Sequence, residues 1–270
     1  MFGYNYYHGS LRRYIIYFGT LFNEIYIDRV DSSNTVAQTI RVPITYGPKD
    51  KVLSRVATDP LLDKPFSSVL PYISFENTGM YFDQERHLNS LNQQVGHDLK
   101  NKNLATMVYN PAAYDLTFEM NVMVKNLEDG VRILEQILPF FQPDWTSTIK
   151  LIDNPDVRMD IPVVLQSIDT KDEWMGNYDK RRVITYTFKF VMRAYFYGPV
   201  TLERVIKKAN INFGTKDGFV DDTVVITPGL TANGTPTIDP ALTVDWSNID
   251  WNQNYDFIID TIISKTYGRL

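Results

Sequence analysis

The chain has 270 residues, enough for one large domain or a domain with an appendage. Its formal net charge of −5 disfavours a protein that grips nucleic acid through a broad basic face, although such a protein could still let DNA pass. Cysteine is absent, which excludes disulfides, thiolate metal sites and cysteine catalysis.

The N-terminal stretch RRYIIYFGTLF imitates a secretory or twin-arginine signal. Its apolar run is about half as long as a membrane span, and Asn23 and Glu24 follow where small residues should mark a cleavage site. We instead predict an amphipathic helix packed on the core, with Ser10 as its N-cap. Six apolar residues recur at helical spacing: Leu11, Tyr14, Ile15, Phe18, Phe22 and Ile25.

Arg12 and Arg13 fall in the first turn of this helix, where the helix dipole disfavours positive charge. We therefore predict that groups outside the helix pair with both arginines, at an interface; two solvated arginines are the alternative.

TIRVPITYG alternates and predicts a strand with Ile40, Val42, Ile44 and Tyr46 on one face. Pro43 cannot donate to a ladder, so this strand is an edge, a possible interface, or carries a bulge. The pattern further predicts a short helix that ends at Pro60, a strand or hairpin in LPYISFENTGMYFD, and an exposed loop with some helix over residues 85–103.

YDLTFEMNVMVKN is the clearest strand, because Leu116, Phe118, Met120, Val122 and Val124 alternate with polar residues. A helix follows it, capped by Asn126, with a Glu128–Arg132 pair one turn apart. Pro139 ends this helix at Leu138. The helix is expected to bury the stripe Leu127, Val131, Leu134 and Leu138, widened by Ile133 and Ile137.

The next residues, LPFFQPDW, predict a rigid aromatic corner. In extended chain Phe140 and Phe141 point to opposite sides, so one enters the core while the other, with Trp145, faces a neighbouring subunit. Packing of both phenylalanines within the chain is the alternative.

RMDIPVVLQSID and RRVITYTFKFVMRAYFYG predict a long hairpin. The second strand would reach roughly 50 Å, so it must bend or extend past its sheet. The connecting loop TKDEWMGNYDK carries Trp174, and a basic cluster follows at Lys180, Arg181 and Arg182. We predict that this loop and cluster contact a partner; a solvated basic face is the alternative.

Composition shifts near Pro199, which divides residues 1–199, an α+β domain, from residues 200–270, an extended C-terminal arm. A basic helical piece, LERVIKKA, begins the arm, and strand-like TVVIT follows it. Trp246 and Trp251 are expected either to dock on a partner or to fold back on the chain.

Recognisable catalytic chemistry is missing. His87 and His97 lie in one polar loop with Glu85 and Asp98, but their spacing matches no zinc pattern. The sequence has no Walker or Rossmann glycine motif and no serine triad in a recognisable order. We therefore predict no catalytic residue, no cofactor and no metal.

Six motifs, in order and near the expected spacing, resemble those of the tail sheath stabiliser and tail terminator family of T-even-type contractile-tailed phages. The resemblance runs from Met1 to about Pro199, and the C-terminal part departs from it. The motifs are MFGYNYY with LRRYIIYFGTLFNEIYI, IRVPITYGPKD, YNPAAYDLTFEM, EQILPFFQPDW, DIPVVLQSI and RRVITYTFKF.

The resemblance implies an α+β fold with a mixed, mainly antiparallel sheet flanked by helices. It also implies a homohexameric ring at the head-proximal end of the tail, which contacts the tail tube, the tail sheath protein and the neck while DNA passes through without sequence-specific binding. Two other functions remain open: a head-completion adaptor with a more basic face, and a tail-associated hydrolase with two carboxylates in a cleft. No membrane segment is expected.

Overall fold

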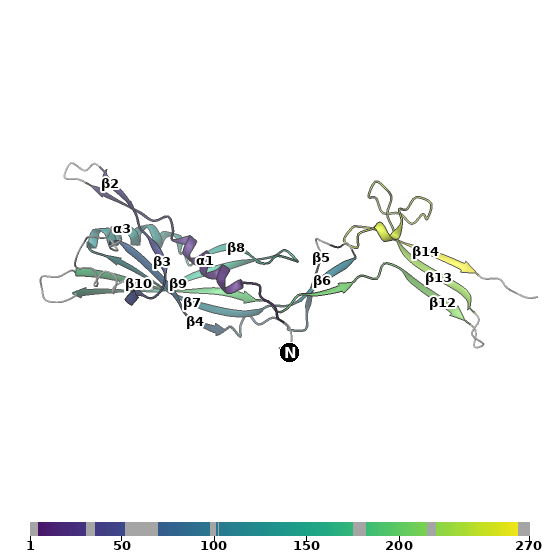
Figure 1. Cartoon of the computed structure of the whole chain (residues 1–270), viewed down its shortest axis with the longest axis horizontal. Helices are drawn as coiled ribbons and strands as arrows, with labels where there is room; N and C mark the ends of the chain where they lie inside the picture. Colours follow the sequence, from purple (N-terminus) through teal and green to yellow (C-terminus); the bar gives the residue numbers. More distant parts are fainter. Residues whose placement is uncertain are drawn as a thin grey trace, which may run out of the picture. The chain divides into compact units, whose positions relative to one another are not determined.

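The computed structural model describes residues 5–30, 36–51, 70–97, 101, 103–174, 182–214 and 220–263. The chain divides into two compact units (Figure 1). Unit 1 comprises Met1–Asn92 and Tyr109–Gly198, and unit 2 comprises Gln93–Val108 and Pro199–Leu270. The C-terminal residues therefore share their unit with a segment from the middle of the chain. No change of composition in the sequence indicates that this middle segment belongs to unit 2.

Unit 1 contains a six-stranded sheet in which β3 pairs parallel to β4 and every other pairing is antiparallel. This is the mixed, mainly antiparallel sheet that the sequence predicts, in a chain whose described residues are mostly β. In spatial order the strands are β3 (Ile44–Tyr46), β4 (Tyr72–Phe82), β7 (Ala112–Val124), β10 (Arg182–Phe196), β9 (Val157–Trp174) and β8 (Asp144–Ile152).

The central strands β7 and β10 supply most of the core. All five apolar residues predicted for the inner face of β7 are buried, and so are Ile184, Tyr186, Phe188 and Phe190 on β10. β10 pairs with β7 from Ile184 to Phe196 and with β9 from Arg182 to Met192, with a register shift at Lys189/Phe190. The long strand is thus central: it is paired on both sides, and the extra residue at the register shift, Gln166, belongs to its neighbour β9.

Helix α1 (Ser10–Leu21) packs against both edge strands, β3 and β8, so the sheet curls around it. Tyr14 and Phe18 are fully buried, and the Phe18 ring stacks on Phe118 with centroids 4.5 Å apart. The predicted apolar helix is therefore confirmed. Its predicted N-cap is wrong, because the helix begins at Ser10 and Gly9 occupies the cap position with φ 67°, which suits a residue without Cβ.

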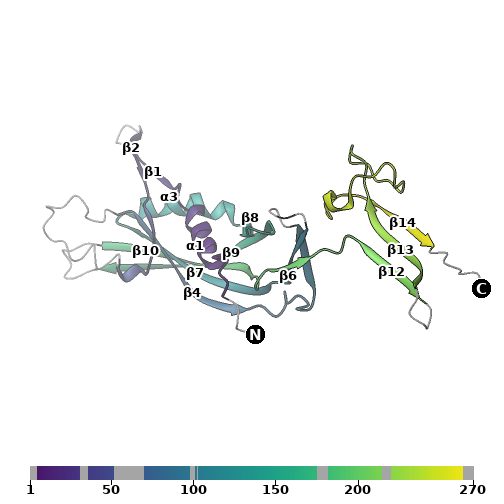
Figure 2. The same ribbon diagram turned by 45° about the vertical axis from the view of Figure 1, so that its right-hand side comes forward.

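Helix α3 (Leu127–Ile137) lies on the same side of the sheet as α1 (Figure 2). Asn126 holds the predicted cap position, and Glu128 pairs with Arg132 as predicted. The predicted stripe is confirmed only for Ile133 and Ile137, which are buried, because Leu127, Val131 and Leu138 are exposed. Gly130 faces the sheet beside the two isoleucines, and a Cβ on Gly130 would overlap the ring of Tyr186. The helix is therefore rotated so that glycine allows this close approach.

TIRVPITYG forms two strands instead of the one predicted. β2 (Val36–Arg41) pairs with β1 (Tyr26–Val30) in a separate ribbon, and β3 begins after Pro43. Pro43 lies in the break, where its missing N–H costs nothing and its carbonyl oxygen accepts from the Ile73 amide. The edge position predicted for the Pro43 segment is thus confirmed for β3.

Unit 2 contains two three-stranded sheets. The first has the order β11 (Thr201–Arg204), β6 (Leu104–Tyr109) and β5 (Gln93–His97), and the second has the order β12 (Ala209–Gly214), β13 (Val220–Gly229) and β14 (Asp256–Ile263).

Two local predictions fail in unit 2. LERVIKKA is not helical, because its first residues form β11 and residues 205–208 have no regular structure. Within residues 85–103 the described part contains β5 and turns instead of helix. The helix predicted to end at Pro60 lies mostly outside the described residues.

Candidate functional site

The aromatic corner after α3 forms where the helix runs into Pro139. Leu138–Phe140 tightens into a 3₁₀ turn, and the Phe141 amide donates to the Leu138 carbonyl oxygen. β8 begins at Asp144, only a few residues later. Because this connection is short and contains two prolines, the directions of its aromatic side chains are closely set.

Phe140 and Phe141 point in different directions, as predicted. Phe141 packs inward, with its ring centroid 5.2 Å from Phe190 and 6.0 Å from Phe22. Phe140 is 59% exposed, and its ring meets Trp145 edge-on at 5.6 Å. The corner therefore anchors itself through one phenylalanine and presents the other to the surroundings.

An apolar pocket of about 560 Å³ opens beside this corner. Its walls come from the end of α1 and the residues after it, from the last turn of α3, and from the corner itself. Phe22, Ile25 and Ile137 form its buried part, while Phe140 and Trp145 form an exposed edge. A pocket lined in this way suits an apolar side chain of another molecule or segment.

The carboxylates of Glu24 and Glu135 give the pocket an acidic rim. Both side chains are exposed, and neither is paired within the part of the chain that the structure describes. A glycosidase would require one of two such carboxyls to be partly buried and so held protonated as a general acid. Both carboxylates of the rim are instead exposed, which makes them accessible to a cation.

Comparison with known proteins places the chain in a family. Residues 5–260 match the T4-like virus Myoviridae tail sheath stabiliser family. The chain belongs to this family. It is also 30% identical over 209 residues to "Tail completion protein gp15" of Enterobacteria phage T4, a match that covers 74% of each chain. The family is one of structural tail proteins, so the chain is a virion tail component.

The family match corrects the expected extent of the likeness. It continues to residue 260, well beyond Pro199, and so includes nearly all of the described part of unit 2. The C-terminal residues are therefore part of what the family shares rather than a departure from it.

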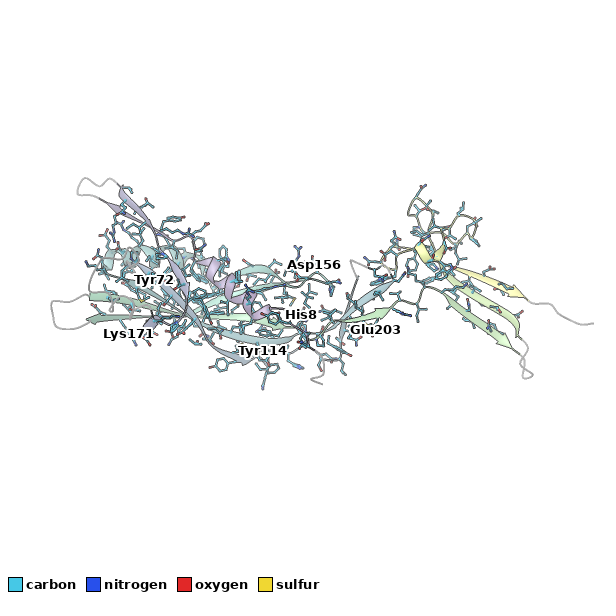
Figure 3. The ribbon with its side chains drawn as sticks, viewed as in Figure 1. His8, Tyr72, Tyr114, Asp156, Lys171 and Glu203 are labelled. Carbon is cyan, nitrogen blue, oxygen red and sulfur yellow. The ribbon has the colours of Figure 1, made fainter. Side chains whose placement is uncertain are left out.

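Of the two arginines in the first turn of α1, the structure pairs one. Arg13 donates to the Lys150 carbonyl oxygen at 2.7 Å and to Asp153 at 2.9 Å. Arg13 holds the pKa of the Asp153 carboxyl below its ordinary value. For Arg13 the predicted partner outside the helix is thus the end of β8 and the turn that follows it, marked by Asp156 in Figure 3. Arg12 is exposed.

In unit 2 the predicted tryptophans fold back on their own unit. Trp251 Nε1 donates to the Leu104 carbonyl oxygen at 3.3 Å, and the Lys208 amine lies 5.7 Å from the centre of the Trp246 ring. Neither side chain is fully buried. The side chains of Trp174 and Arg182, together with Lys180 and Arg181, lie outside what the structure describes, so their predicted roles stay predictions.

Sequence reasoning missed an apolar sheet face in unit 2. Register places Ile211 and Phe213 of β12 on the same face as Phe257 and Ile259 of β14, and all four are exposed. The alternation of apolar residues in ANINFG and YDFII indicates such a face. The Gly, Pro, Asn and Thr content of the surrounding sequence led instead to the prediction of an extended arm. Glu24 and Glu135 were also missed, because nothing in the sequence brings them to one surface feature.

Among the described residues, no group of three or more potential ligands could hold a metal ion. His87 is exposed, whereas the His97 side chain and Asp98 lie outside the described part. No helix of the described residues is both long and apolar enough to span a membrane.

Proposed function

We propose that this tail protein is the terminator and sheath stabiliser of a contractile tail. Copies assemble into a closed hexameric ring at the head-proximal end, where the ring caps the tail tube, anchors the last sheath ring and meets the neck or head-completion protein. Family membership and the name of the T4 relative support this role. The role is structural, with neither catalytic residues nor a cofactor.

The apolar face of the β12–β13–β14 sheet carries the proposal. Phe257 is 61% exposed and Ile259 is 67% exposed, beside Ile211 and Phe213 on the same face. The opposite face of this sheet already buries Ile258, and contiguous apolar surface left on a soluble protein marks an interaction site. This face is therefore expected to be covered by another copy or by a neighbouring tail protein.

The outer strands of both units add a second means of association. β3 and β8 are the edge strands of the six-stranded sheet, and β12 and β14 are the edge strands of the β12–β13–β14 sheet. Such edges can extend a sheet into a neighbour, and a head-to-tail ring uses each surface once and then stops growing. A net charge of −5 suits a ring through which DNA slides without sequence-specific binding.

Electron microscopy of tails assembled with and without the purified chain tests this proposal. We expect a six-fold ring at one end of complemented tails, and sheaths that contract or dissociate when the chain is missing. A chain that binds DNA-filled heads but leaves tails uncapped would contradict the proposal. A purified protein that neither forms rings alone nor binds tails would do so as well.

The domain boundary near Pro199 enters this proposal as residues 1–199, a terminator-like domain, and 200–270, an extension that docks on neighbours. Deletion of residues 200–270 should leave the six-stranded sheet folded, because all its strands belong to unit 1. The truncated chain should lose ring formation. An insoluble truncated chain would show that the boundary is wrong; circular dichroism and light scattering distinguish the outcomes.

A further inference from the structure

The pocket beside Phe140 and Trp145 has properties that specify its occupant. Its apolar interior excludes a polar segment, and its rim carries the carboxylates of Glu24 and Glu135, which no described residue pairs. The complementary ligand is therefore an exposed apolar side chain with a cation next to it and no carboxylate nearby.

Unit 2 presents such a pair in the segment between β11 and β12. Ile206 is 86% exposed, the highest value among the large apolar side chains described. Burial alternates along this segment, so Ile206 and Lys208 are exposed while Val205 and Lys207 are half-buried. The Lys207 amine donates to the Ile249 carbonyl oxygen at 2.6 Å, which ties the base of the segment to its own unit.

The Lys208 charge remains available. Its amine lies over the Trp246 ring, and no carboxylate pairs with it within the described residues. Other strongly exposed apolar side chains fit less well: Ile238 precedes Asp239, and Leu91 stands between Ser90 and Asn92. Charge thus selects the segment 205–208.

We propose that the pocket of one copy receives Ile206 of a neighbouring copy, with Lys208 placed against the acidic rim. The inference rests on the proposed ring, and it identifies one contact within it. Pocket and segment belong to different units of the same chain, so the contact is head-to-tail, as a closed ring requires. Each copy then offers one pocket and one segment, and ring closure leaves neither unfilled.

Charge reversal in the full-length chain gives a first test. Glu24→Lys with Glu135→Lys, or Lys208→Glu alone, should weaken subunit association at least about tenfold, because like charges then meet. Adding Lys208→Glu to the double rim variant should restore association. Lys171→Glu, on β9 (Figure 3), is the matched control and should have no effect. Mass photometry over a dilution series measures association; failure of the triple variant to recover would contradict the pairing.

A disulfide test identifies the occupant, since the chain has no cysteine of its own. Glu135→Cys and Lys208→Cys chains, with tags of different mass, are mixed where the wild type assembles and are then oxidised. A mixed dimer should form, and it should not form when Leu127→Cys, on the same helix, replaces Glu135→Cys. Thermal melting confirms that each variant is folded.

The remaining outcomes overturn the inference in distinguishable ways. Rings without the mixed dimer would leave the proposed function intact and assign the pocket to another tail protein. If a chain that carries both cysteines forms only an intramolecular disulfide, the segment fills the pocket of its own chain. Absence of any ring, alone or on tails, would remove the proposed function and this contact together.

Discussion

Adjacent phenylalanines at the corner offer a matched pair of perturbations. Phe140→Ala and Phe141→Ala remove the same atoms one residue apart, yet the structure assigns them different surroundings. Phe141 packs on Phe22 and Phe190, whereas Phe140 is 59% exposed and touches Trp145. We expect the first substitution to act on folding and the second on association.

The magnitudes follow from burial. Complete burial of a Phe side chain is worth about 1.5–3 kcal/mol, so with 59% of its surface exposed Phe140 should contribute about 1 kcal/mol. Phe141 is half-buried and packs on two aromatic rings, so removing its ring should cost about 2 kcal/mol. The difference of about 1 kcal/mol corresponds to a roughly fivefold change in the opening equilibrium of unit 1.

Hydrogen exchange measured by mass spectrometry is the appropriate assay, because a two-unit chain need not unfold in one step. Peptides from β7 and β10 report the opening of unit 1 directly. We expect faster exchange for Phe141→Ala than for Phe140→Ala, and weaker ring formation for Phe140→Ala. Equal acceleration by both substitutions would show that the corner does not divide its aromatic residues in this way.

Three further predictions concern unit 1. Gly130→Ala should lower the urea midpoint although Ala is favoured in helices by about 1 kcal/mol, because the new Cβ overlaps the Tyr186 ring; a higher midpoint would contradict the packing. Burial, and then the like charge of Glu119 on the paired strand, raise the pKa of Glu76, so its ionised form destabilises the fold; Glu76→Gln should raise Tm at pH 7 and have no effect below about pH 4. Arg13 lowers the pKa of Asp153, so Asp153→Asn should lower Tm at pH 7, and this loss should shrink as the pH falls below the ordinary pKa of Asp and the native carboxylate protonates.

Strand periodicity predicted the centre of unit 1 because β7 and β10 each have one face under the helices. Leu116 and Phe118 on β7, and Phe188 and Phe190 on β10, are all fully buried. An alternation of period two shows directly which residues share a face of the strand, and here the apolar face packs into the core.

Long-range pairing could not be predicted in the same way. β6 pairs with β11 through Thr106 and Leu202, which lie almost a hundred residues apart. Neither strand has a strong alternating pattern, and LERVIKKA has better helix propensity than strand propensity. Tertiary pairing overrides such local preferences, so the assignment of a mid-chain segment to unit 2 had no sequence signal.

The candidate site was predicted in part. Two prolines and two phenylalanines indicated the corner, because proline restricts the chain and consecutive residues of an extended segment diverge. The acidic rim was not predictable, since Glu24 follows α1 and Glu135 lies on α3, and only the curled sheet brings these helix ends to one pocket.

The error on α3 has a more general cause. Apolar periodicity shows that a helix has an apolar stripe, but it does not show whether the stripe faces the chain's own core or another molecule. Here Gly130 takes the central contact and leaves Leu127 and Val131 exposed, just as alternation in unit 2 leaves Phe257 and Ile259 exposed. A monomeric enzyme of this size would normally bury such residues. Their exposure at several separate places is what a subunit requires when part of its apolar surface is completed by its neighbours.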